Sequence, residues 1–144
     1  MNKEFFTHSP EETEALGRWL GERLLERDGA FVALYGELGV GKTAFTRGLA
    51  AALGYTKPVK SPTYTILNEY RGGKIDIFHF DLYRIEDEDD LWAVGFWDRL
   101  DERGVVVCEW SERIPGATPE DAVRVTIARG EYDDDRIITF EGDI

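Results

Sequence analysis

The sequence predicts an α/β fold with a mixed, mostly parallel central sheet, flanking helices and antiparallel hairpins. Two apolar runs, 31–35 and 105–109, have the length of strands that are covered on both faces, as in a parallel sheet. Between them, residues 43–53 have the composition and length of a helix. Near the C-terminus, 123–127 and 136–140 alternate like strands on either side of an acidic turn, which is typical of an antiparallel hairpin.

The N-terminal segment predicts an edge strand followed by an amphipathic helix. Residues 3–7 fit a short strand, and Ser9 with Pro10 forms a helix start, with Ser as the N-cap. Apolar residues then recur at helical spacing until Asp28-Gly29, which we expect to end the helix. Most of this helix is expected to pack in the core, and Thr13 in its first turn is a candidate for the edge of a base pocket.

Residues 36–43, GELGVGKT, fit the phosphate-loop pattern of Gly, four residues, Gly-Lys and then Ser or Thr. A strand precedes this stretch and a helix follows it, with Gly54 as the expected stop. Glycines let the backbone curl so that several N–H groups point inward, and the helix start adds positive potential. We therefore expect one P-loop NTPase-like domain over 1–144, with Lys42 on the β- and γ-phosphates and the Thr43 hydroxyl on Mg²⁺.

Residues 57–64 contain two prolines and two lysines and are predicted to form a loop. One interpretation is a plain surface connection. The other is a switch loop that brings Ser61 or Thr63 near the γ-phosphate, because the segment after a phosphate-loop helix often has that role.

The next segment predicts a hairpin. Residues 64–71 and 74–82 alternate like strands around Gly72-Gly73, which is a two-residue hairpin signal. The second strand is apolar on both faces, so we expect both to be covered. It places His79 and Asp81 on one face near its end, and we interpret His79 as a packed or hydrogen-bonded side chain rather than a catalyst.

The acidic run 86–90 suits the start of a helix. The aromatic group after it is expected to be mostly core, with docking of a partner protein as the alternative.

Glu109 ends the strand 105–109, where phosphate-loop proteins commonly place an acid that holds Mg²⁺. Asp81 is its rival for that role, and Trp110 either shields the site or packs.

The segment between the last buried strand and the final hairpin, 111–119, is predicted to be a loop or a short helical turn. The acidic turn 132–135 lacks the Gly and the distal Glu of a calcium loop, so we interpret it as a solvated turn.

Composition limits the function classes. The chain has 144 residues, 42% hydrophobic residues and a net charge of −12, so it should fold and should repel nucleic acid over most of its surface. A direct, sequence-specific nucleic-acid reader is therefore disfavoured, and any role in nucleic-acid metabolism would run through a protein partner. A lone cysteine, Cys108, and the lack of a signal-peptide pattern or a membrane-length apolar run predict a cytoplasmic location.

The sequence favours ATP over GTP, since it has no Asn-Lys-x-Asp box. It also lacks an Arg-rich lid and is short for a small-molecule kinase. Nucleotide hydrolysis and nucleotide-gated binding without significant hydrolysis remain as the two main alternatives.

The chain resembles the bacterial TsaE (YjeE) family in four stretches that occur in order along it, GELGVGKTAFTRGLAAALG, VKSPTYTILNEY, HFDLYR and CEW. The likeness covers roughly residues 9 to 112. SPTYT and HFDLYR are far more distinctive than the phosphate loop. The sequence departs from the family after Trp110, where Ser111-Glu112 stands in place of a frequent proline.

The resemblance implies a small ATPase that hydrolyses ATP slowly by itself with Mg²⁺. Its partners would be TsaD and TsaB, whose complex performs the threonylcarbamoyladenosine modification of tRNA. Asp81 would orient or deprotonate the attacking water, with Lys42 as the second catalytic residue. Thr43 and Glu109 would hold Mg²⁺, and Ser61 and Thr63 would form the switch. The implied nucleotide-binding residues are Thr13, Glu37, Leu38, Gly39, Val40, Gly41, Lys42, Thr43, Ala44 and Trp110.

An arginine finger is not obvious in the sequence, although Arg71 and Arg84 are candidates near predicted strand ends. Such a group contributes about 10³–10⁵ in rate. The pattern therefore predicts slow intrinsic turnover and a partner that completes the site.

Overall fold

The computed structural model describes residues 2–27, 29–62 and 65–144, and within them a seven-stranded sheet has the order β1-β7-β6-β2-β5-β4-β3. The strands are β1 (Asn2–Thr7), β2 (Ala30–Tyr35), β3 (Leu67–Tyr70), β4 (Ile77–Asp81), β5 (Val105–Glu109), β6 (Val123–Arg129) and β7 (Arg136–Glu141). The helices are α1 (Pro10–Leu24), α2 (Lys42–Ala52), α3 (Glu88–Ala93) and α4 (Phe96–Asp101), with a 3₁₀ turn η1 (Ser111–Arg113) after β5.

The four central strands β6, β2, β5 and β4 are parallel, whereas β3 and the pair β7–β1 add antiparallel strands at the two edges. This arrangement confirms the predicted α/β class with a mixed, mostly parallel centre. The expected edge strand at the N-terminus and the C-terminal hairpin are both present as β1 and as β6–β7. Parallel strands direct their carboxyl ends to one edge of the sheet, which is where ligands bind in open α/β folds.

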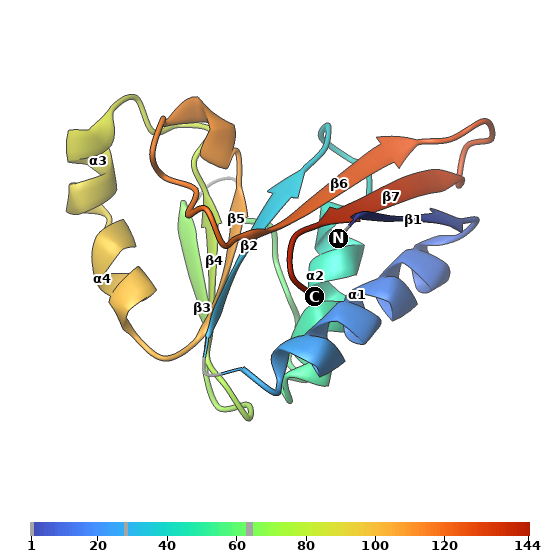
Figure 1. The fold of residues 1–144 in the computed structure, drawn as a ribbon, viewed down its shortest axis with the longest axis horizontal. Helices are drawn as coiled ribbons and strands as arrows, with labels where there is room; N and C mark the ends of the chain where they lie inside the picture. The colour runs from blue at the N-terminus through green and yellow to red at the C-terminus, as the bar shows by residue number, and fades with distance from the viewer. Residues whose placement is uncertain (1, 28, 63–64) are drawn as a thin grey trace.

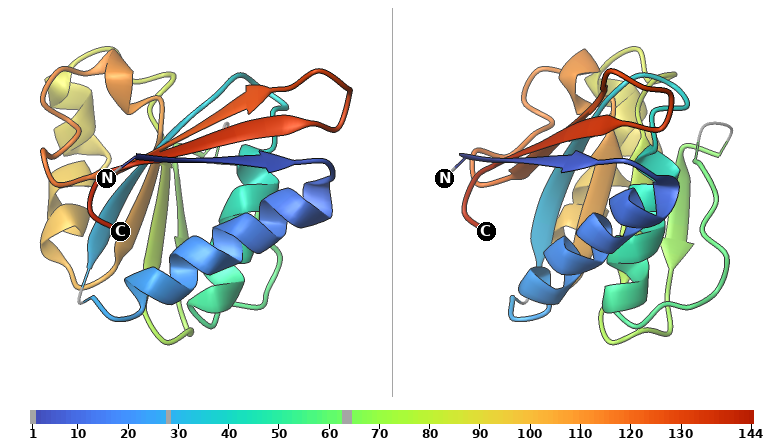
Figure 2. Two further views of the ribbon diagram at one scale, coloured as in Figure 1. Left: turned by 45° about the vertical axis from the view of Figure 1, so that its right-hand side comes forward. Right: turned by 90° about the vertical axis from the view of Figure 1, so that its right-hand side faces the viewer.

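Helices α1 and α2 cover one face of the sheet, and α3 and α4 cover the other (Figure 1). Turned views show the same two layers around a strongly twisted sheet (Figure 2). Along β4, Ile77 packs toward α1 and α2, whereas Phe78 and Phe80 pack toward α3 and α4. All five residues of β4 and of β5 are buried, which confirms that both strands are covered on both faces.

Helices α1 and α2 approach each other closely at glycines, and most closely at Gly48 and Gly17. A Cβ at Gly48 would lie 1.8 Å from the carbonyl oxygen of Glu14, and one at Gly17 would lie 2.0 Å from that of Phe45. No heavy atom fits at those distances, so the two backbones are in direct contact. This contact fixes α2, the helix that begins at Lys42.

Local signals explain most helix boundaries. The Ser9 hydroxyl accepts the Glu12 N–H at 3.1 Å at the start of α1, and Asp87 caps α3 in the same way. The first helix ends at Leu24, earlier than the predicted stop at Asp28-Gly29. Gly95 adopts a left-handed conformation, with φ of 74°, and separates α3 from α4.

The hairpin before β5 differs from its prediction at both strands. Tyr70 pairs with Ile77, so residues 71–76 connect the strands and Gly72-Gly73 is not a two-residue turn. The reason is tertiary: the Lys74 N–H donates to the Leu53 carbonyl at the end of α2, so it does not extend β4. At the other end, Ile66 has a positive φ of 68°, and β3 begins only at Leu67.

The aromatic segment after the acidic run is mostly core, as predicted. Leu91 and Phe96 are fully buried against β4, but Trp92 is 62% exposed. None of the helices in the described ranges is both long enough and apolar enough to span a bilayer.

Candidate active site

The phosphate loop connects β2 to α2 and takes the backbone shape that its glycines permit. Gly36, Gly39 and Gly41 have φ values of 151°, 76° and 117°, a region that side chains with a Cβ avoid. Gly41 is the N-cap of α2 and supplies no side-chain acceptor, so the first N–H groups of the helix have no side-chain cap. A helix start of this kind is suited to an anion.

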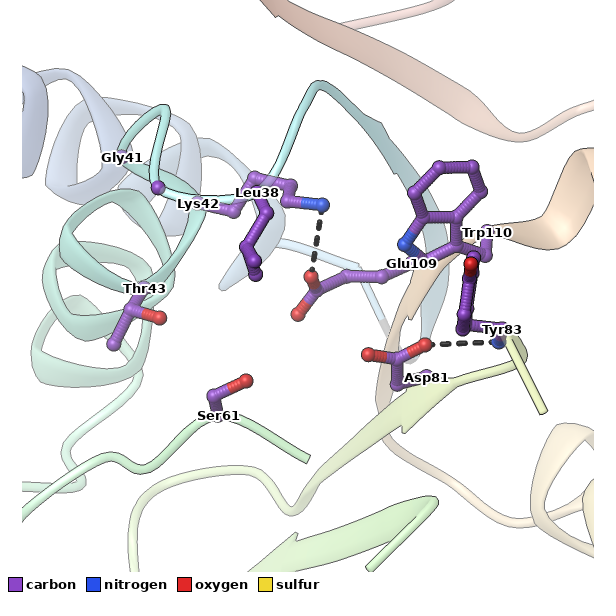
Figure 3. Close-up of a pocket in the computed structure, with 10 residues that line it drawn as sticks. Leu38, Gly41, Lys42, Thr43, Ser61, Asp81, Tyr83, Glu109 and Trp110 are labelled. Atoms are coloured by element: carbon purple, nitrogen blue, oxygen red, sulfur yellow. Dashed lines mark hydrogen bonds and ion pairs between the residues drawn. The ribbon is translucent and has the colours of Figure 1, made fainter. Parts of the chain in front are cut away.

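A cavity of about 540 Å³ opens beside this loop, at the carboxyl ends of β4 and β5. Figure 3 shows charged and polar groups from four segments pointing toward it. It therefore combines most of the residues that the sequence singled out, which are far apart in the chain. The lining residues are Leu38, Gly39, Gly41, Lys42, Thr43, Ser61, Asp81, Tyr83, Glu109 and Trp110.

Lys42 and Glu109 form a buried ion pair across the cavity, with 3.3 Å between Nζ and Oε1 (Figure 3). The other carboxylate oxygen of Glu109 lies 2.6 Å from Nε2 of His79, which is fully buried. Burial alone would raise the pKa of Glu109, but the hydrogen bond and charge of His79, together with Lys42, lower it. The carboxylate of Glu109 is thus held ionised, and the predicted hydrogen-bonded role of His79 is confirmed.

Asp81 lies opposite Glu109 in the β4–β5 register and also faces the cavity. Its carboxylate accepts the Tyr83 N–H at 2.9 Å. Burial raises the pKa of Asp81, the Tyr83 hydrogen bond opposes this, and the charge of Glu109 raises the pKa again, so the net shift is upward. A carboxylate with a raised pKa is a better proton acceptor than a fully solvated one.

Trp110 forms the outer wall of the cavity with Tyr83. Their rings are 5.0 Å apart, and Nζ of Lys42 lies 5.4 Å from the centre of the Trp110 indole. Trp110 has a positive φ of 61°, which is uncommon for a bulky residue and turns the chain directly after Glu109. Tyr83 was not among the predicted site residues, although alternation from Asp81 along HFDLYR places it nearby.

A second, smaller cavity of about 120 Å³ lies on the other side of the phosphate loop. Thr13 and Ala44 line it, so the structure places these two predicted residues apart from Asp81. The Thr13 hydroxyl is hydrogen-bonded to that of Thr7 at 2.9 Å. Two further lining residues, Asp134 and Arg136, are not predictable from spacing, because they come from the β6–β7 hairpin folded over the loop.

The remaining predicted residues take varied positions. Val40 lines the smaller cavity, while the Glu37 side chain is 85% exposed, pairs with Arg129 at 3.9 Å and lines neither cavity. Ser61 lines the larger cavity, and Thr63 lies outside the described residues.

The two arginine-finger candidates are not supported. Arg71 follows Tyr70, which pairs with the first residue of β4, and its guanidinium binds Glu69 and Asp76 there. It therefore lies at the end of the strand opposite Asp81. Arg84 is exposed and is not among the residues that line the larger cavity.

The donor set suits Mg²⁺ only together with phosphate. Within the described ranges, no group of three or more His, Cys, Asp or Glu residues could hold a metal. The cavity does offer hard oxygen donors in Thr43, Asp81 and Glu109. Mg²⁺ is usually held by one or two carboxylates plus substrate phosphates, so these residues fit a metal that arrives with a nucleotide.

Comparison with known proteins gives one consistent result. The family profile described as "Threonylcarbamoyl adenosine biosynthesis protein TsaE" matches residues 7–138. The tRNA threonylcarbamoyladenosine biosynthesis protein TsaE of Bacillus subtilis (strain 168) is 39% identical over 134 residues, covering 93% of this chain and 82% of that protein. Its counterpart in Nostoc sp. is 39% identical over 129 residues, covering 88% and 78%. The crystal structure of B. subtilis YdiB matches with a TM-score of 0.82 and 33% identity over 97% of this chain and 84% of that one.

Proposed function

Because this chain belongs to the TsaE family, we propose that it is an ATPase of 144 residues in one P-loop domain. It binds ATP with Mg²⁺, hydrolyses it slowly by itself, and supports the threonylcarbamoyladenosine modification of tRNA. The observation that carries the proposal is the cavity of about 540 Å³, which brings the phosphate loop, Thr43 and two strand-end carboxylates together around Lys42.

Different residues of the chain would bind the phosphates, the Mg²⁺ ion and the adenosine. The N–H groups at the start of α2 and the ammonium of Lys42 would receive the β- and γ-phosphates, in a loop whose shape already suits them. Thr43 and Glu109 would hold Mg²⁺, which neutralises charge on the phosphate oxygens. The adenosine would extend past Gly39 and Gly41, which line both cavities, into the smaller cavity beside Thr13.

Hydrolysis requires a water in line with the γ-phosphate. Asp81 faces the cavity and would orient this water and accept its proton as the new P–O bond forms. The bond from the γ-phosphorus to the bridging oxygen breaks, and ADP and phosphate leave. Phosphoryl transfer needs positioning and charge neutralisation more than covalent chemistry, so these few groups supply its basic parts.

We expect slow turnover because none of the described residues that line the larger cavity is an arginine that could stabilise the transition-state charge. Arg136 lines the smaller cavity, but its guanidinium already binds the carbonyls of Val40, Asp133 and Asp135. We therefore expect the TsaD–TsaB complex to complete the site, with a basic face that meets a chain of net charge −12 in the cytoplasm.

The second candidate is a nucleotide-gated binding switch without significant hydrolysis. The position of Ser61 favours it, because this loop residue lines the cavity and would contact the bound phosphates. In that case the nucleotide would set the shape of the loop and a partner would respond to it.

Phosphate release from Mg²⁺–ATP, measured with and without purified TsaD–TsaB complex, tests the proposal. We expect slow release by the chain alone and stimulation by the complex. Tight ATP binding with no release under either condition would favour the switch. Failure to bind ATP at all would overturn both candidates.

A further inference from the structure

A chain of four contacts leads from the phosphate loop to the loop that contains Ser61. Lys42 pairs with one oxygen of Glu109 at 3.3 Å, and the other oxygen lies 2.6 Å from Nε2 of His79. On the far side of the imidazole, Nδ1 lies 3.0 Å from the Tyr70 hydroxyl. That hydroxyl donates to the carbonyl oxygen of Lys60 at 2.9 Å, directly before Ser61.

Each contact in this chain joins two specific atoms. The Tyr70 hydroxyl donates to the Lys60 carbonyl and also lies within hydrogen-bond distance of Nδ1 of His79. An ionised carboxylate can only accept, so Nε2–H of His79 donates to Glu109. Movement of the Glu109 carboxylate would strain the contact with His79, and rotation of the imidazole would break its bond to Tyr70.

Burial makes the contacts costly to lose. His79 is 0% exposed, and Tyr70 and Glu109 are each 4% exposed, so water is not at hand to replace a broken bond. At the loop end, the Lys60 carbonyl accepts a second bond, from the side-chain N–H of Asn68 at 3.1 Å. The loop is thus attached to β3 at the atom where the contact chain ends.

We propose that His79 and Tyr70 are positioning residues that couple occupancy of the nucleotide site to the conformation of the Lys60–Ser61 segment. This inference rests on the proposed function, because phosphates that attract Lys42 would change the partner of Glu109. Glu109 would then change its hydrogen bond to His79, and the imidazole would transmit this movement to the loop through the Tyr70 hydroxyl. A coupling of this kind needs contacts that differ between the two states, which the Lys42–Glu109 pair provides.

Tyr70→Phe tests the coupling because it removes one hydroxyl and keeps the ring. Tyr55→Phe is the matched control, since the Tyr55 ring packs 4.9 Å from that of Tyr70. The readout is trypsin cleavage after Lys60, followed by mass spectrometry with and without a saturating non-hydrolysable ATP analogue. Lys57 precedes a proline and is a poor trypsin site, so cleavage in this loop reports Lys60.

In the unmodified chain and in Tyr55→Phe, we expect the analogue to slow this cleavage by about fivefold or more, the usual lower range of a coupling between sites. In Tyr70→Phe, we expect the ratio of the two rates to fall close to one while calorimetry shows retained affinity for the analogue. Cleavage after Arg103, which is exposed on a different loop, serves as the reference for general loosening of the fold.

His79→Gln is the second variant, because glutamine can keep an N–H toward Glu109 but has no group in place of Nδ1. It should uncouple the loop in the same way. If the analogue slows cleavage equally in Tyr70→Phe and Tyr55→Phe, the nucleotide protects the loop by direct contact and the coupling is overturned. If the unmodified chain does not bind the analogue, the proposed function itself fails.

Discussion

Asp81 and Glu109 are direct register partners at the ends of two neighbouring parallel strands, yet their carboxyl groups have opposite electrostatic environments. Lys42 and His79 hold Glu109 ionised and lower its pKa, whereas burial raises the pKa of Asp81. Two carboxylates whose pKa values are driven apart usually have two roles. We infer that Glu109 stays negatively charged and that Asp81 is the group that accepts a proton.

Asp81→Asn should abolish most hydrolysis while leaving ATP binding intact. Amide and carboxylate have the same shape, and the amide oxygen can still accept the Tyr83 N–H, but the amide cannot take a proton from water. We expect phosphate release to fall about 10²–10⁴-fold, the usual contribution of a general base. Asp76→Asn is the control, because Asp76 pairs with Arg71 at the other end of β4. Equal loss in both variants would contradict the assignment.

Lys42→Ala should weaken ATP binding by at least tenfold, or about 1.4 kcal/mol. The ammonium is the only charged group that the phosphate loop contributes to the larger cavity. Calorimetric titration with Mg²⁺–ATP measures the loss, and circular dichroism checks that the fold is retained. Lys57→Ala removes the same charge at an exposed loop position and should bind normally. Normal binding by Lys42→Ala would refute the phosphate-loop assignment.

Ala44→Leu tests where the adenosine lies. Ala44 lines the smaller cavity, and a leucine keeps helix propensity while adding bulk there. ATP should bind more weakly, whereas inorganic tripolyphosphate, which has no nucleoside, should bind as before. Competition between the two ligands measures the difference within one sample. Equal weakening of both would place the nucleoside elsewhere.

Gly17→Ala should destabilise the fold even though alanine is the better helix former by about 1 kcal/mol. The added Cβ would collide with the Phe45 carbonyl, so we expect a net loss of about 1–3 kcal/mol in the free energy of unfolding. Urea denaturation measures this change. The displaced α2 should also lower nucleotide affinity. An increase in stability would mean that the two helices separate at little cost.

His8→Gln should reduce the dependence of stability on pH. The hydrogen bond to Asp135, with its charge, raises the pKa of His8. A raised folded-state pKa gives stability that is fully present below the unfolded value of about 6.5 and is lost as pH rises through the folded value. Between about pH 6 and about pH 8, the melting temperature of the unmodified chain should therefore fall more than that of His8→Gln. Parallel curves would show that the Asp135 contact does not persist in solution.

The sequence predicted the architecture well wherever an element depends on local patterns of residues. Continuous apolar runs indicated the central strands, and the glycines of 36–41 indicated the loop that they form. The predicted two-residue turn at Gly72-Gly73 is wrong because the Lys74 N–H bonds to the end of α2, a contact that spacing does not reveal. Asp134 and Arg136 were missed for the same reason, since only folding brings the last hairpin over the phosphate loop.

In the candidate site, the positions set by the backbone were predictable from the sequence, whereas the side-chain contacts were not. Strand ends predicted that Asp81 and Glu109 would meet the phosphate loop, because parallel strands share one edge. Spacing did not indicate that Lys42 would pair with Glu109, or that Tyr70 would join His79 to Lys60. These side-chain contacts depend on tertiary packing, which the spacing of residues does not specify.

The enclosed imidazole of His79 also gives the chain a built-in spectroscopic reporter. The sequence contains two histidines, and the other, His8, is exposed. A ring N–H that is buried and hydrogen-bonded exchanges slowly with water, so the His79 ring should give a proton resonance far downfield of the amides. Titration with nucleotide, followed by one-dimensional proton spectra of unlabelled protein, would then record events at Glu109 without any tag or substitution.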